Sequence, residues 1–160
     1  MADDGGVDFV LAAYREEGNW QVEALPRHVA DDLDVLITVL YQRPGDDGAL
    51  GLISVDEDFF IAVRVQGADV RFLLSDVTAA ADWPIARAVL QRLELPLPED
   101  EERVQPAGDL ALFARFGVES MTTAAICDQL DLYPEDMLGE LADQMGFGPQ
   151  YEAALDAVFG

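Results

Sequence analysis

Three apolar segments between residues 50 and 75 are separated only by short polar turns, and this pattern constrains the fold most. The segments are 50–55, 59–66 and 70–75, and the turns are 56–58 and 67–69. Turns this short join antiparallel strands, because parallel strands need a crossover of about a dozen residues or more. We therefore predict an antiparallel three-stranded meander.

Alternation along the second and third segments assigns their side chains to two faces of the sheet. One face carries six apolar residues: Ile61, Val63, Val65, Val70, Phe72 and Leu74. The opposite face carries Arg64 and Arg71, because successive side chains of a strand point to opposite sides. The sequence thus predicts a core on one face and a pair of cations on the other.

The residues before the meander predict a hairpin and a helix. Apolar residues alternate at 7–13 and again at 20–24, as they do in two paired strands. From Leu33 the apolar residues follow the spacing i, i+3, i+4, i+7 of a helix face, and Asp31 or Asp32 is a suitable N-cap. With a second helix predicted after the meander, the order is ββαβββα over residues 1–95.

The second helix is predicted at 83–93, with Asp82 as its cap. The composition of the chain changes after this helix. Residues 96–108 hold three prolines and four consecutive acids, which predicts an extended, solvated linker. Every later segment favours a helix: about 109–116, 120–130, 134–145 and 149–159. We predict an α+β protein with an antiparallel-sheet domain at 1–95 and a small all-helical subdomain at 109–160.

Net charge is the second strong constraint. The chain carries 32 acidic residues and 9 basic ones, all arginine, for a net charge of −23. Such a field repels nucleic acids and anionic lipids and attracts a protein partner with a basic surface. An alternative stays open, in which the charge serves solubility alone.

The residues of familiar catalytic centres are missing from the sequence. The single histidine, His28, lies in a turn without a nearby nucleophile, and the single cysteine, Cys127, lies on the apolar stripe of a helix. One histidine and one cysteine cannot build the usual zinc site, and no phosphate-binding glycine motif occurs. We therefore predict neither metal nor cofactor and no enzyme activity, although an unknown carboxylate-based activity stays open.

Two groups of residues are candidate binding sites. Arg64 and Arg71 could together bind a carboxylate or phosphate; the alternative is pairing with local acids. The run Glu99, Asp100, Glu101 and Glu102 could meet a basic partner or bind a divalent cation; the alternative is a disordered, solvated linker.

No apolar run reaches the roughly 20 residues that a membrane span needs. The start of the chain lacks a signal peptide's basic and apolar pattern, and a single cysteine cannot form an internal disulfide. These features predict a cytoplasmic protein.

Several segments in order resemble a known family. They are 59–65, 70–76, Ala81-Asp82-Trp83-Pro84, 109–113, Cys127-Asp128, Leu132-Tyr133-Pro134-Glu135-Asp136 and Met145-Gly146-Phe147-Gly148. Together they resemble the actinobacterial tRNA adenosine deaminase-associated proteins, from about Val7 to the C-terminus. The family's name reflects gene adjacency to a TadA-like deaminase, which implies association with that enzyme. The resemblance supplies no catalytic residues.

The leading hypothesis is therefore a non-catalytic accessory protein that binds a basic partner, for which the resemblance suggests a TadA-like deaminase, and that does not bind nucleic acid directly. The second hypothesis is a small-molecule or metal sensor that uses the sheet face around Arg64 and Arg71.

Overall fold

The computed structural model describes residues 6–45, 47–99 and 103–160. A sheet lies at its centre, with the strand order β2-β1-β3-β4-β5-β6 and antiparallel pairing between all neighbours. The strands are β1 Val7–Glu16, β2 Asn19–Leu25, β3 Ala49–Val55, β4 Phe59–Gln66, β5 Asp69–Leu74 and β6 Ala107–Gly108. The predicted α+β class with an antiparallel sheet is confirmed.

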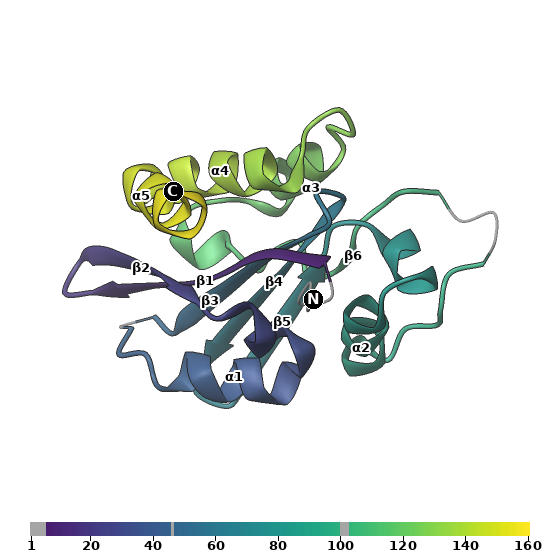
Figure 1. Ribbon diagram of the computed structural model, residues 1–160, viewed down its shortest axis with the longest axis horizontal. Helices are drawn as coiled ribbons and strands as arrows, with labels where there is room; N and C mark the ends of the chain where they lie inside the picture. Colours follow the sequence, from purple (N-terminus) through teal and green to yellow (C-terminus); the bar gives the residue numbers. More distant parts are fainter. Residues whose placement is uncertain (1–5, 46, 100–102) are drawn as a thin grey trace.

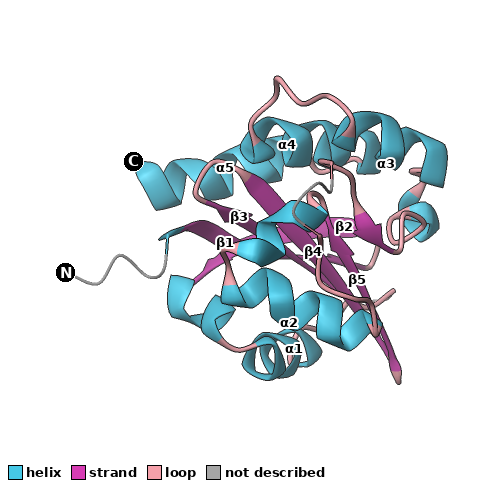
Figure 2. Cartoon of the chain, turned by 90° about the vertical axis from the view of Figure 1, so that its right-hand side faces the viewer, coloured by secondary structure: helices cyan, strands magenta, loops and turns pink. Residues whose placement is uncertain are grey.

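Helices cover both faces of this sheet (Figures 1 and 2). The helices are α1 Leu33–Tyr41, α2 Pro84–Leu93, α3 Ser120–Cys127, α4 Pro134–Met145 and α5 Gly148–Phe159. α1 and α2 lie on one side, and the three C-terminal helices lie on the other. The sheet is therefore the middle layer of three.

The first core lies between the sheet and the two earlier helices. The predicted apolar face of the meander is confirmed, because Ile61 opposes Leu74 and Val63 opposes Phe72 in the register of β4 and β5. These side chains are buried in one cluster with Leu36 of α1 and with residues of α2.

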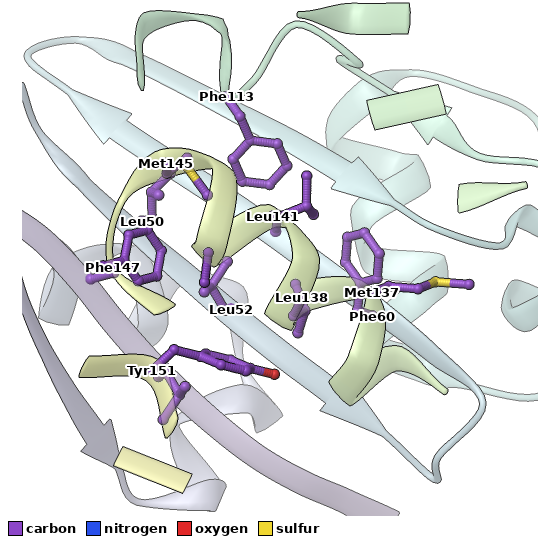
Figure 3. Close-up of a cluster of buried hydrophobic side chains, with 14 of the residues drawn as sticks. Leu50, Leu52, Phe60, Phe113, Met137, Leu138, Leu141, Met145, Phe147 and Tyr151 are labelled. Atoms are coloured by element: carbon purple, nitrogen blue, oxygen red, sulfur yellow. The ribbon is translucent and has the colours of Figure 1, made fainter. Parts of the chain in front are cut away.

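The second core lies on the opposite face, between the sheet and the C-terminal helices (Figure 3). Leu50, Leu52 and Phe60 of the sheet are buried against Leu138 of α4 and Tyr151 of α5. The sheet and residues 109–160 thus share one apolar cluster. The predicted division of the chain at 96–108 stays a prediction.

Local signals in the sequence set several helix ends. Asp32 caps α1, because its Oδ1 accepts a hydrogen bond from the Asp34 N–H at 2.8 Å. α4 ends at Gly146, whose φ of 100° lies in the left-handed region that glycine adopts without strain. These predicted boundaries are confirmed.

The predicted helix at 109–116 is wrong. The segment forms turns and a short 3₁₀ helix, Ala114–Phe116, directly after strand β6. Asp109 Oδ1 accepts from the Ala111 N–H at 2.8 Å, as an N-cap does, but the backbone bonds that follow join residues three apart, as in 3₁₀ turns. The segment then ends at Gly117, whose φ of 99° lies in the left-handed region. The start of α2 also differs from the prediction: its N-cap is Trp83, not Asp82.

Candidate functional site

Five exposed carboxylates gather on the outer side of the C-terminal helices, and we call them the acidic face. They are Glu135, Asp136, Glu140 and Asp143 of α4 and Glu152 of α5. Met137, Leu138 and Leu141 point the opposite way, into the second core, so the amphipathic pattern of α4 turns its acids outward. The acidic face is therefore a direct consequence of the packing of α4 on the sheet.

The acidic face surrounds a hollow of about 300 Å³ between α4, α5 and the loop before α4. Gln129 and Leu132 of that loop complete the lining together with Gly139. Gln129 Nε2 donates to Glu140 Oε2 at 3.1 Å, which holds one wall of the hollow in place.

A second hollow, of about 190 Å³, adjoins the first and shares Glu135 and Asp136 with it. Two aromatic residues line this hollow and are largely exposed to solvent: Tyr133 is 61% exposed and Phe159 is 59% exposed. Asp8 also lines it and accepts hydrogen bonds from Ser54 Oγ and the Glu57 N–H, both at 2.8 Å. Aromatic rings beside carboxylates are suited to hold a guanidinium or ammonium group.

The charges of the acidic face are not compensated within the described part of the chain. No ion pair there joins any of its five carboxylates to an arginine. Burial raises the pKa of the Glu135 carboxyl, and the neighbouring carboxylates Asp136 and Glu152 raise it further. The face therefore presents a negative potential that a cationic partner would relieve.

The arginine pair predicted as a binding site is brought together, since Arg64 and Arg71 oppose each other in β4 and β5. Arg64 Nη1 donates to the Leu112 carbonyl at 3.0 Å, and both guanidinium groups pair with Asp69. Arg71 also reaches Asp109 at 3.3 Å. The hydrogen bond from Arg71, followed by that from Arg64, lowers the pKa of the Asp69 carboxyl. The pair thus has partners within the chain, and its role in binding a ligand stays a prediction.

The predicted acidic run is described only at its start. Glu99 is exposed, whereas Asp100, Glu101 and Glu102 lie outside the described residues. A role for the run in meeting a partner stays a prediction.

His28 lies exposed in the 3₁₀ helix Arg27–Asp31, away from the acidic face. Within residues 6–45, 47–99 and 103–160 no group of three or more acids, histidines and cysteines has the arrangement of a metal site. None of the helices described there is long and apolar enough to cross a membrane.

The Cys127 thiol is expected to react with a thiol reagent at pH 8 far more slowly in the folded chain than in urea. Cys127 is only 3% exposed, and burial raises the pKa of its thiol to about 12, so almost no thiolate exists in the folded state. Absorbance-monitored labelling should show one reactive thiol per chain after denaturation. Rapid, complete labelling of the folded chain would contradict this.

The sequence predicts an acidic C-terminal part, with 14 acids and 2 arginines over residues 96–160, but not which of its acids gather on one face. No basic residue follows Arg115, and nine acids lie between there and the C-terminus. That signal predicts an acidic C-terminal surface, but the fold decides which acids gather on it.

The fold and the acidic face together define a small acidic α+β protein, with hollows lined by carboxylates on its C-terminal helices. Residues 8–148 match the model of the Rv3753c-like tRNA adenosine deaminase-associated proteins, and the chain belongs to this family. It is also 37% identical over 151 residues to Protein Rv3753c of Mycobacterium tuberculosis (strain ATCC 25618 / H37Rv), covering 92% of this chain and 87% of that protein. No solved structure matches the chain. The resemblance noted in the sequence is confirmed.

Proposed function

We propose that the chain is a non-catalytic accessory protein that binds a TadA-like tRNA adenosine deaminase through the acidic face. The family's description supports an association with such an enzyme. The observation that carries the proposal is the acidic face itself, five exposed carboxylates without an arginine partner in the described chain, next to exposed Tyr133 and Phe159.

The charge of the chain selects the kind of partner. A deaminase that holds tRNA needs a basic surface, and such a surface attracts a protein with a net charge of −23. The same charge disfavours direct contact between this chain and tRNA, because both are polyanions. Contact with the enzyme is therefore the association that electrostatics favours.

The chemistry of deamination belongs to the partner in this proposal. Zinc deaminases carry an H-x-E and a P-C-x-x-C signature, whose histidine and cysteines hold the metal. In this chain His28 is followed by Val29 and Ala30, and Cys127 is the only cysteine. The zinc ligands of a deaminase are thus missing from the sequence.

The test is a titration of the purified chain into the purified TadA-like deaminase from the same genome, by calorimetry at low and at moderate salt. We expect binding at low salt that weakens as salt rises, because surface charges are screened over about 10 Å at 0.1 M salt. No heat at either salt, together with no co-elution on gel filtration, would show that the two proteins do not associate.

Neutralising three of the five carboxylates of the acidic face is expected to weaken this binding about tenfold at low salt. The affinity should then also depend less on the salt concentration. The variant is Glu140→Gln, Asp143→Asn and Glu152→Gln, all exposed on α4 and α5. The matched control makes the same change in net charge elsewhere, on exposed residues near α1 and α2: Asp31→Asn, Asp82→Asn and Glu94→Gln. Equal weakening by both variants would point to net charge alone and against the acidic face.

A further inference from the structure

Strand β2 forms an outer edge of the sheet and lacks the features that usually protect such an edge. It pairs with β1 on one side and with no other strand among the described residues. Its seven residues include no proline, lysine or arginine, and its register with β1 is continuous, without a bulge. Its one charged residue, Glu23, is held by Tyr14 and Arg43 on the α1 side. Natural sheets rarely leave so long an edge unprotected.

Helix α5 lies beside strand β2 (Figure 1). A groove of about 360 Å³ runs between this helix and the strand edge. One wall consists of the β2 residues Trp20–Ala24. The other wall consists of Gln150, Ala153, Ala154 and Ala157, which share one face of α5 because they follow the spacing i, i+3, i+4, i+7. Trp20 is buried at the base against Phe116 and Phe147, so the edge is fixed in position.

We propose that an extended, basic segment of a partner protein adds to β2 as a further strand and lies in this groove. The strand edge offers N–H and C=O groups at alternate residues, which only another extended backbone satisfies in series. The alanine wall leaves room for the side chains that such a segment turns toward α5. Paired strands rise by the same distance per residue, so a segment of about seven residues spans the edge.

Charge decides between a partner segment and a second copy of this chain. Two copies would each bring a net charge of −23 and repel each other. A basic segment would instead be attracted to the negative charge of the chain. The inference rests on the proposed function, since it gives the deaminase a second point of contact.

The test uses the full chain, the same purified deaminase and a neutral change in the groove. Ala153→Gln with Ala157→Gln fills the groove without altering charge; both alanines are exposed on α5. Ala125→Gln, at an exposed position of α3, is the matched control. We expect the double variant to bind on the order of tenfold more weakly at low salt and the control to bind like the unaltered chain.

Hydrogen exchange of the unaltered chain supplies a second measurement that depends on no variant. Backbone amides of residues 19–25 are expected to exchange more slowly in the complex than in the free chain. Binding without slower exchange in β2, or equal affinity of all variants, would overturn the strand addition and leave the proposed function standing. A concentration-dependent dimer that the double variant abolishes would assign the edge to a second copy instead. No binding by the unaltered chain would overturn both proposals.

Discussion

A chain truncated after Gly108 is expected to be insoluble or unfolded. Its sheet would keep α1 and α2 on one face but lose the helices that cover Phe9, Leu11, Leu52 and Phe60 on the other. Burial of each such side chain contributes about 1.5–3 kcal/mol. The loss over the whole face is comparable with the entire net stability of a small domain, about 5–15 kcal/mol. Expression of residues 1–108, followed by gel filtration and circular dichroism, checks this.

Limited proteolysis of the full chain provides the control for this truncation. The predicted linker at 96–108 is expected to be cut first, within 97–107, because of its prolines and acids. The two fragments should then elute together under native conditions and separate in urea, because the second core holds them together. A soluble, cooperatively unfolding 1–108 fragment, or a first cut within 59–75, would contradict this account.

The sheet could be predicted because its signals are local. Period-two alternation over 59–66 and 70–75 fixed the strands and their core face, and the register of β4 with β5 confirms both. The second covered face was missed, although β3 is buried at all seven positions. A continuous apolar run such as 49–55 indicates a strand that is buried on both faces of the sheet. The alternation along 59–66 and 70–75 predicts burial on one face only.

The missed features depend on contacts between distant parts of the chain. Residues 109–116 were predicted to be helical from local composition, yet their structure follows from β6, where Gly108 brings the backbone close to Phe72. The acidic face likewise depends on how α5 lies beside α4, which places Glu152 among the acids of α4. Local pattern can assign a residue to a helix face, but it cannot say which second element meets that face.

Replacing Arg64 with methionine is expected to destabilise the chain by about 1–3 kcal/mol, the usual cost of leaving a buried acceptor unsatisfied. The Arg64 side chain is only 11% exposed, and its Nη1 donates to the Leu112 carbonyl at 3.0 Å. That bond ties the turn at 109–116 to β4, and the turn carries the fully buried residues Leu112 and Phe113. Urea unfolding followed by circular dichroism measures the loss.

The arginine on the neighbouring strand is the matched control for this change. The Arg71 side chain is 50% exposed and pairs with Asp69 at 2.8 Å, a surface ion pair that solvent screens. Arg71→Met should therefore cost less stability than Arg64→Met. An equal or larger loss from Arg71→Met would contradict the anchoring role of Arg64.

The same two variants separate an anchoring role from the predicted ligand site. If Arg64 and Arg71 are committed to Asp69, Asp109 and the Leu112 carbonyl, phosphate or citrate at millimolar concentration should leave the melting temperature of the unaltered chain unchanged. A ligand that binds only the folded state raises that temperature increasingly as its concentration exceeds its dissociation constant. A rise with phosphate or citrate that disappears in Arg71→Met, at matched ionic strength, would instead establish the arginine pair as an anion site.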